Sequence, residues 1–135
     1  MPYLTALITV LALMVYIAVF LKVGKARGTY GVKAPATTGN EAFERVYRVQ
    51  MNTLEQLVLF LPALWLFSAF APTDYSEYAV AVLGGAWLVG RVLYARAYYA
   101  APAKRAAGFI ISFFAASLLL LGALAGIVMH LVAGA

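Results

Sequence analysis

Long uncharged stretches alternate with short clusters of charged residues along the chain. The first stretch, residues 2–21, has 20 residues without a charge, and three bases follow it at Lys22, Lys25 and Arg27. About 20 mostly apolar residues cross the hydrocarbon core of a bilayer as an α-helix. The pattern therefore predicts a membrane-spanning helix over about residues 2–23. Because the bases follow the apolar run instead of preceding it, we expect an uncleaved anchor and not a signal peptide.

A segment rich in turn-forming residues comes next. Residues 28–40 contain three glycines, one proline and three threonines, which is typical of an ordered or semi-ordered loop. Asn40 is a suitable N-cap and two glutamates follow it, so we expect a second helix over residues 41–70. Its apolar part, residues 57–71, spans only about 22 Å. The hydrocarbon core is about 30 Å thick, so the apolar part alone is too short to cross it. We therefore expect the polar residues before it to lie within the membrane as well, namely Asn52, Glu55 and Gln56.

The second half of the chain repeats this alternation. After a turn at residues 71–74, the pattern predicts a third helix over residues 76–99, whose uncharged part is too short to keep Arg91 outside the membrane. A break at Pro102 precedes a fourth helix, predicted over residues 104–133. The expected fold class is an all-α membrane protein, in which residues 1–135 form a single domain with a four-transmembrane-helix bundle.

Composition supports this class and excludes several kinds of chemistry. Only 11% of the residues are charged and 65% are hydrophobic, whereas soluble domains carry about a quarter charged residues. The mean hydropathy is +0.91. The chain has no cysteine and one histidine, His130, which we interpret as an interfacial residue. A cysteine nucleophile, a thiolate metal site and a Ser-His-Asp triad are therefore excluded, and we expect no metal.

The distribution of the bases predicts how the chain is oriented. All ten lie in or beside the first and third connections, and none lies in the second connection or at either terminus. By the positive-inside rule, we expect those two connections to be cytoplasmic and both termini to be non-cytoplasmic. The bases do not form a soluble face with interleaved aromatic residues, so nucleic acid is not an expected partner. They are Lys22, Lys25, Arg27, Lys33, Arg45, Arg48, Arg91, Arg96, Lys104 and Arg105.

Two stripes of polar residues carry the candidate chemistry. Helical spacing of three and four places on one face of the second helix Arg45, Arg48, Asn52, Glu55 and Gln56. The same spacing places on one face of the third helix Arg91, Tyr94 and Tyr98, and Arg105 follows the break. Both stripes begin at the predicted cytoplasmic side, so we expect a cationic pocket between the two helices, in one subunit or between neighbours. Guanidinium groups bind carboxylates, and Tyr, Asn and Glu side chains bind amides and ammonium groups.

A structural interpretation competes with this one. Basic residues at helix ends can reach the headgroups, and polar residues inside a membrane can join helices. We favour that interpretation for Arg45, Arg96 and Lys104. We favour function for Arg48, Asn52, Glu55 and Arg91, because ionisable groups at depth are costly and usually mark a site. Interfacial aromatic residues are the default interpretation of Tyr98, Tyr99, Tyr75, Tyr78 and Trp65. Gly84, Gly85 and Gly90 favour close helix contact.

Residues 43–56, FERVYRVQMNTLEQ, preceded by PATTG at residues 35–39, resemble the signature of the membrane-associated proteins in eicosanoid and glutathione metabolism, the MAPEG family. The resemblance extends over the whole chain, through four spans, a basic first connection and the pattern Arg91-x-x-Tyr94-x-x-x-Tyr98 followed by Arg105. It implies a homotrimer of four-helix subunits that binds glutathione between neighbours. A lipophilic substrate would enter from the membrane lipids.

The resemblance also implies roles for individual residues. In one subunit, glutathione would contact Arg27, Arg48, Gln50, Asn52, Glu55 and Gln56. The adjacent subunit would contribute Arg91, Tyr94 and Tyr98, and the residue that activates the thiol would be Arg105. A guanidinium lowers the pKa of a nearby thiol from about 8.5 and so favours the thiolate. The implied activities are glutathione transfer to a lipophilic electrophile and reduction of a lipid hydroperoxide.

Two departures from the family pattern narrow the resemblance. The eicosanoid synthases have a tyrosine where this chain has Gln56, and the leukotriene-forming branch has a second arginine where this chain has Gly28. Both departures favour the general microsomal-type glutathione transferases, including bacterial members. Short connections resemble those of bacterial members, so we expect an inner-membrane protein with a cytoplasm-facing site.

Two other functions stay open at this point. The family also includes a protein that presents fatty acid without chemistry, so a non-catalytic lipid-binding scaffold is the first alternative. A small four-helix drug exporter with Glu55 as its proton carrier is the second. The arginines around Glu55 argue against the exporter, because they would hold this carboxylate ionised.

Overall fold

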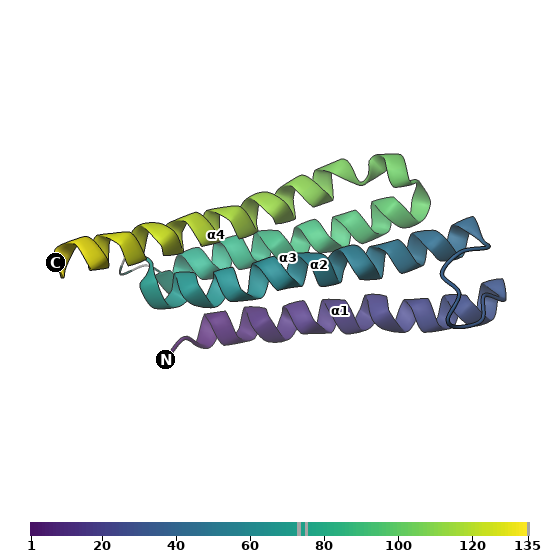
Figure 1. Ribbon diagram of the computed structural model, residues 1–135, viewed down its shortest axis with the longest axis horizontal. Coiled ribbons are helices and arrows are strands. Elements are labelled where there is room, and N and C mark those ends of the chain that lie inside the picture. Colours follow the sequence, from purple (N-terminus) through teal and green to yellow (C-terminus); the bar gives the residue numbers. More distant parts are fainter. Residues whose placement is uncertain (73, 75, 135) are drawn as a thin grey trace.

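A computed structural model of the chain describes residues 1–72, 74 and 76–134 and shows four long helices packed side by side (Figure 1). The two termini lie at one end of the bundle, and the first and third connections lie at the other. The turn expected at residues 71–74 includes Thr73, which lies outside the described residues, as does Tyr75. In chain order, the elements are α1 (Tyr3–Tyr30), α2 (Glu41–Phe70), α3 (Ser76–Ala100), the short 3₁₀ helix η1 (Pro102–Lys104) and α4 (Ala106–Ala133).

The first helix is longer than predicted. We expected it to end near residue 23, where the charges begin, but α1 continues to Tyr30. Lys and Arg are good helix formers, so a helix can continue past the end of its apolar run. It stops at Gly31, which has a φ of 67° in the left-handed region that glycine adopts without steric cost. The N–H groups of Gly31 and Val32 both donate to the Arg27 carbonyl, which closes the last turn.

The other helix limits follow the predictions closely. The side chain of Asn40 accepts a hydrogen bond of 2.9 Å from the Phe43 N–H, which confirms the predicted N-cap of α2. The start of α4 was predicted two residues too early. Pro102 opens the turn η1, which includes Lys104, so that α4 begins at Ala106. Arg105 therefore lies at the junction of η1 and α4, and this junction directs its side chain.

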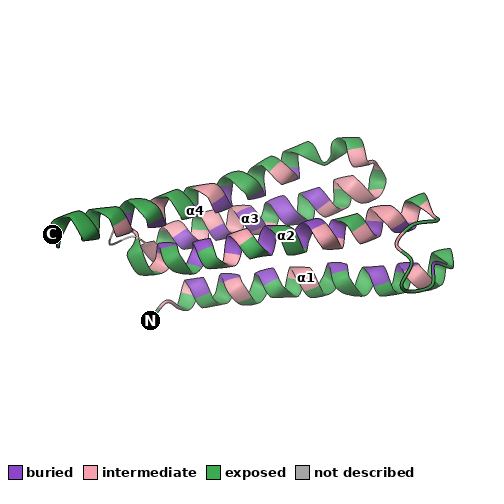
Figure 2. Cartoon of the chain, in the orientation of Figure 1, coloured by how far each residue is buried: buried purple, intermediate pink, exposed green. Residues whose placement is uncertain are grey.

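The four helices bury a common core and expose an apolar outer surface. In the middle of the bundle, the rings of Phe60 and Trp87 are stacked with centroids 4.1 Å apart. Figure 2 shows buried positions along the facing sides of the helices and exposed positions along the outer sides of α1 and α4. Large exposed residues include Ile17 and Phe114. Each helix is long and apolar enough to cross a membrane, so this outer surface suits contact with lipid.

Helices α3 and α4 approach each other closely near the basic end. A Cβ on Gly90 would lie 2.8 Å from the Ser112 nitrogen and 2.9 Å from the Gly108 oxygen, so this contact excludes a side chain. A Cβ on Gly108 would overlap the backbone of Tyr94. Gly90 therefore permits the close helix contact that we predicted for it. The contact holds the start of α4, and with it Arg105, against the half of α3 that carries Tyr94.

At the end of the bundle that holds the two termini, a polar cluster joins α1, α2 and α3. The Glu77 carboxylate of α3 accepts hydrogen bonds from the Leu4 N–H at 2.9 Å, the Thr5 hydroxyl at 2.7 Å and the Ser68 hydroxyl at 3.1 Å. Leu4 lies in the first turn of α1, where N–H groups have no partner within the helix. Glu77 therefore caps α1 from a neighbouring helix and ties the end of the bundle together.

Candidate functional site

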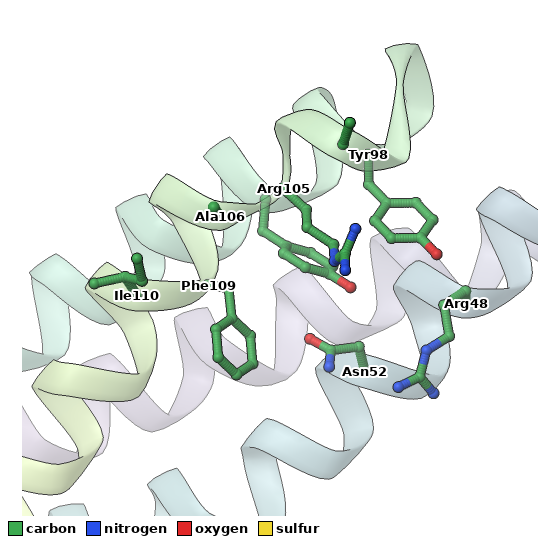
Figure 3. A pocket seen from close by; sticks show the side chains of 9 residues that line it. Arg48, Asn52, Tyr98, Arg105, Ala106, Phe109 and Ile110 are labelled. Atoms are coloured by element: carbon green, nitrogen blue, oxygen red, sulfur yellow. The ribbon is translucent and has the colours of Figure 1, made fainter.

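Five of the ten residues predicted to carry chemistry meet in a cavity at the basic end of the bundle, between α2, α3 and the start of α4 (Figure 3). Its volume is about 660 Å³, within the 300–1,000 Å³ that is usual for small-molecule sites. We call it the arginine cavity. It is lined by Arg48, Asn52, Tyr94, Tyr98, Ala103, Arg105, Ala106, Phe109 and Ile110.

Each element contributes side chains that its helical repeat directs to the same side. Arg48 and Asn52 are four residues apart on α2, as are Tyr94 and Tyr98 on α3, so each pair shares a face. The Tyr94 and Tyr98 rings lie 5.5 Å apart. Arg105 enters from the other side of the cavity, and Figure 3 shows its side chain extending into the space above Asn52. One Arg105 amino group donates to the Pro102 carbonyl at 2.8 Å, and this bond orients the guanidinium.

Arg48 and Glu55 form an ion pair at the edge of the cavity. Two parallel contacts of 3.0 and 3.4 Å join the guanidinium to the carboxylate, and both side chains are about half exposed, at 48% and 54%. Exposed ion pairs contribute about 0–1 kcal/mol, so a charged ligand can replace either partner at little cost. This pair therefore offers one cationic and one anionic contact to a zwitterionic ligand.

Arg91 contacts Asn52 of the cavity wall and is almost fully buried, at 1% exposure. Its Nη1 donates to the Asn52 amide oxygen at 2.7 Å, and its guanidinium carbon lies 4.3 Å from the centre of the Tyr94 ring. Within the described part of the chain, the Nε and Nη2 atoms have no hydrogen-bond partner. No carboxylate in residues 1–72, 74 and 76–134 forms a salt bridge with it. A buried cation in this state favours an anion or water beside it.

Gln56 extends the polar face of α2 below Asn52. Its side chain is 7% exposed, and its amide oxygen is buried and lacks a partner among the described residues. Because Asn52 and Gln56 are one turn apart, both face the interior at the level of Arg91 and Trp87. One turn beyond the cavity residue Asn52, a buried polar group thus keeps free hydrogen-bonding capacity among the described residues.

The outer part of the site reaches the first connection. A depression of about 510 Å³ shares Arg48 and Tyr98 with the arginine cavity. It includes Arg45, which we had interpreted as a headgroup contact. It also includes Thr37, so the first connection borders the site. The third connection does so through Ala103.

Arg27 and Gln50 do not reach the arginine cavity. They line a separate depression of about 590 Å³ between α1 and α2, which we call the α1/α2 groove. The Gln50 amide donates to the Tyr16 hydroxyl at 3.3 Å. Arg27 donates to the carbonyl oxygens of Val32 at 3.3 Å and Ala36 at 2.7 Å. Residues two apart on a helix do not share a face, which is why Gln50 and Arg48 point to different sides of α2.

The expected division of the site between subunits therefore needs correction. We expected Arg91, Tyr94 and Tyr98 to come from a neighbour and Arg27 and Gln50 to join Arg48 in one subunit. In the structure, the α3 residues face Asn52 within the same chain, and Arg27 and Gln50 face elsewhere. The physical reason is that α2 and α3 are consecutive antiparallel helices, so that stripes at the same end meet directly.

Sequence reasoning missed two apolar residues of the site. Phe109 and Ile110 line the cavity from the first turn of α4. Phe109 follows Arg105 by four residues, and that spacing was the available signal. Their side chains give the cavity an apolar wall beside its guanidinium groups. Among the described residues, no cluster of three or more His, Cys, Asp or Glu could hold a metal ion.

Comparison with known proteins gives consistent matches over nearly the whole chain. The model of the MAPEG family matches residues 5–125. An uncharacterised protein of Synechocystis is 53% identical over 93% of this chain and 89% of its own length. Human microsomal glutathione S-transferase 2 is 41% identical over 77% of this chain and 69% of its own length. Bovine leukotriene C4 synthase is 35% identical over 94% of this chain and 82% of its own length.

Proposed function

This chain belongs to the MAPEG family, and its relatives include a microsomal glutathione S-transferase. Since it also has four helices that can cross a membrane, we propose that it is a membrane-bound glutathione transferase. It conjugates glutathione to lipophilic electrophiles, as a detoxification enzyme does. The observation that carries this proposal is the convergence of Arg48, Asn52, Tyr94, Tyr98 and Arg105 on one cavity of suitable size. The cavity combines cationic groups with an apolar wall, as a site for one polar and one lipophilic substrate requires.

Glutathione suits the groups that are present. It has two carboxylates, one ammonium group and two amides. Arg48 and the buried Arg91 can each hold a carboxylate, and guanidinium groups bind carboxylates through paired hydrogen bonds. Glu55 can hold the ammonium group when glutathione replaces Arg48 as its partner. Asn52, Gln56 and the two tyrosine hydroxyls then remain for the amides.

Arg105 is positioned to act on the thiol. Its guanidinium has five donors, of which one binds Pro102, so the others can face the sulfur. A positive charge beside the sulfur lowers its pKa and favours the nucleophilic thiolate. Conjugation then forms a carbon–sulfur bond as the thiolate attacks an electrophilic carbon, and the leaving group departs with the electron pair. Phe109 and Ile110 would hold the lipophilic substrate next to the sulfur.

The same site supports a glutathione-dependent peroxidase reaction. The thiolate attacks the terminal oxygen of a lipid hydroperoxide, which yields a sulfenic acid and, after protonation, the lipid alcohol. A second glutathione converts the sulfenic acid to the disulfide and water. Two thiols are thus oxidised for each hydroperoxide reduced. No residue beyond those that favour the thiolate is needed.

We further infer that the active form is a homotrimer, in which the α1/α2 groove of one subunit closes on the arginine cavity of the next. This arrangement would bring Arg27 and Gln50 to a glutathione held by Arg48, Arg91 and Arg105. A head-to-tail contact between two different surfaces generates a closed ring when the rotation from one subunit to the next closes, as it does in a trimer. The separation of these residues on two sides of α2 supports the arrangement, because one chain alone cannot use both sets on one ligand.

The membrane orientation follows from the basic end of the bundle. All ten bases lie toward the end that holds the first and third connections, and the arginine cavity opens there. By the positive-inside rule, this end and the glutathione site face the cytoplasm and both termini lie outside. We propose a bacterial inner membrane as the host. Cytoplasmic activity of reporters fused to the termini would refute the orientation.

A direct assay tests the function. The purified protein is supplied with glutathione and either a chlorodinitrobenzene-type electrophile or a lipid hydroperoxide, and conjugate and disulfide are measured separately. Turnover of either acceptor supports the enzyme. Binding of glutathione with no turnover of any acceptor would contradict it and would favour a non-catalytic lipid-binding scaffold.

A further inference from the structure

A third depression lies on the other side of α1, between α1 and α3. We call it the α1/α3 groove. It has a volume of about 230 Å³, below the range that is usual for compact small-molecule ligands. It is lined by Val15, Ala18, Val19, Lys22, Arg91, Val92, Ala95, Arg96 and Tyr99. Its small volume and elongated set of lining residues suit a single hydrocarbon chain.

The groove is lined mainly by apolar side chains between the buried Arg91 and the exposed bases at its other end. From Val15 to Lys22 it follows α1 for about 10 Å, from the middle of the bundle to the basic end. Lys22 and Arg96 are both exposed and lie at that end. None of the described residues that line the groove is acidic.

Among the described residues, no carboxylate forms a salt bridge with the bases of the groove. The Lys22 ammonium lies 3.7 Å from the centre of the Tyr99 ring, a contact that adds no negative charge. Arg91 also lines the groove, but it is five residues from Arg96 and its hydrogen bond joins it to Asn52 of the arginine cavity, so it belongs to that site. The groove therefore combines a slot for a hydrocarbon chain with two exposed cations at one end, Lys22 and Arg96.

We propose that the α1/α3 groove is a binding site for an anionic membrane lipid, whose headgroup lies between Lys22 and Arg96 and whose acyl chain lies along the groove. Basic residues where a transmembrane helix leaves the membrane attract anionic headgroups. The side chains of Val19, Val92 and Ala95 provide the apolar surface for the chain. The proposal concerns a face distinct from the arginine cavity and does not depend on glutathione chemistry.

The charge pattern favours a lipid over a second copy of this chain. In an anionic lipid the charged headgroup is joined directly to an apolar acyl chain. The groove has the matching arrangement, with its bases at one end and its apolar side chains next to them. A second copy would have to place a carboxylate at the membrane surface, and of its five acidic residues only Glu41 and Glu44 begin a helix at the basic end of the bundle. Apolar surface continues beyond the groove, because Leu11, one turn before Val15 on the same side of α1, is exposed.

Native mass spectrometry of the purified full-length protein tests the headgroup preference. The protein is mixed with equal amounts of phosphatidylglycerol and phosphatidylcholine, and the lipid that is retained is counted. We expect phosphatidylglycerol to be retained at least about fivefold over phosphatidylcholine, because each basic residue favours an anionic lipid by about that factor. Lys22→Gln/Arg96→Gln should abolish the preference. The charge-matched variant Lys33→Gln/Lys104→Gln, outside the groove, should keep it.

A groove-filling variant tests the location. Ala95→Trp should displace the retained phosphatidylglycerol, and Leu93→Trp, an exposed position on the same helix outside the groove, should not. Equal retention of both lipids by the unaltered protein would refute the proposal, as would equal loss in both double variants. A change of subunit number in Ala95→Trp would assign the groove to a second copy. Displacement by free glycerol phosphate would assign the basic end to a soluble anion.

Discussion

The Arg91 guanidinium donates a hydrogen bond of 2.7 Å to the Asn52 amide oxygen and so joins α3 to α2 at the wall of the arginine cavity. Both side chains are buried, and Asn52 is the only hydrogen-bond partner of the Arg91 side chain within the described part of the chain. A buried charge that loses its partner is costly, since water cannot replace the lost bond. The contact therefore has two roles: it stabilises a charge inside the bundle and orients the remaining donors.

Replacing Asn52 should weaken both roles. We expect Asn52→Leu to lower the free energy of unfolding by about 1.5–3 kcal/mol, the range for hydrogen bonds to charged groups. Glutathione affinity should fall as well, because Arg91 loses its orientation. Thermal unfolding and glutathione titration of the purified protein measure the two effects. Leu54→Ala, at a partly exposed position of the same helix, is the control, and equal effects of the two variants would contradict the role of the bond.

Arg105 should be required for chemistry and not for binding. We expect Arg105→Ala to bind glutathione but to lose thiolate absorbance, with turnover reduced by about 10²-fold or more, as when one charge-stabilising donor is removed. The residual rate should rise with pH toward the ordinary thiol pKa of about 8.5, because a higher pH restores the thiolate that the guanidinium no longer favours. Lys104→Ala removes a neighbouring charge and is the control. Unchanged turnover in Arg105→Ala would refute the assignment.

Arg48 should affect ligand binding without affecting stability. Its ion pair with Glu55 is about half exposed and contributes about 0–1 kcal/mol, so Arg48→Ala should leave the unfolding temperature nearly unchanged. Glutathione affinity should fall, and the fall should shrink as ionic strength rises, because salt screens exposed charges. Calorimetric titration at two salt concentrations measures this. A large loss of stability with unchanged affinity would show that the pair is structural.

A single methyl group at Gly108 should disturb the site from a distance. Its Cβ would overlap the Tyr94 backbone, so Gly108→Ala must separate α3 from α4 and shift Arg105. Overpacking of this kind costs about 1–3 kcal/mol. Gly85→Ala is the matched control, because nothing lies within 4 Å of its Cβ and alanine favours helix. Unfolding temperature and turnover should both fall in Gly108→Ala and stay unchanged in Gly85→Ala. Equal changes in the two variants would contradict the role of the close contact.

Most of the fold could be predicted from hydrophobic runs, caps and charges. The Asn40 cap and the limits of α2 follow from local side-chain chemistry, which acts within a few residues. The end of α1 could not be predicted from the charge boundary. Lys and Arg tolerate helix, and the stop depends on the left-handed conformation of Gly31 and its hydrogen bonds to Arg27. The start of α4 likewise depends on how Pro102 turns the chain.

The site was less predictable, because periodicity assigns residues to a face but does not say which helix covers that face. The spacing of Arg48 and Asn52 correctly placed them together, and Arg91 with Tyr94. The pairing of Asn52 with Arg91 in one chain depends on helix packing, including the contact of Gly90 with Gly108. Gln50 was grouped with Arg48 by family resemblance, although the helical repeat directs the two to different sides of α2.

The separation of Gln50 and Arg27 from Arg48 leads to a test of the proposed assembly. One variant, Arg48→Ala/Arg105→Ala, has a defective arginine cavity and an intact α1/α2 groove. The other, Arg27→Ala/Gln50→Ala, has the opposite defects. If the groove of one subunit closes on the cavity of the next, each variant alone should have low activity, whereas co-expression should restore part of it. Mixed oligomers then contain sites that combine an intact cavity with an intact groove.

Transferase activity is measured for the two variants co-expressed and for the same two variants purified separately and then mixed without subunit exchange. Recovery only on co-expression means that one site uses residues of two chains. A co-expressed sample that is no more active than the mean of the two parents would contradict the shared site. In that case the role of Arg27 would be to stabilise the first connection through its hydrogen bonds to Val32 and Ala36. The role of Gln50 would be to join α2 to α1 through its hydrogen bond to Tyr16. Each subunit would then bind glutathione with the arginine cavity alone.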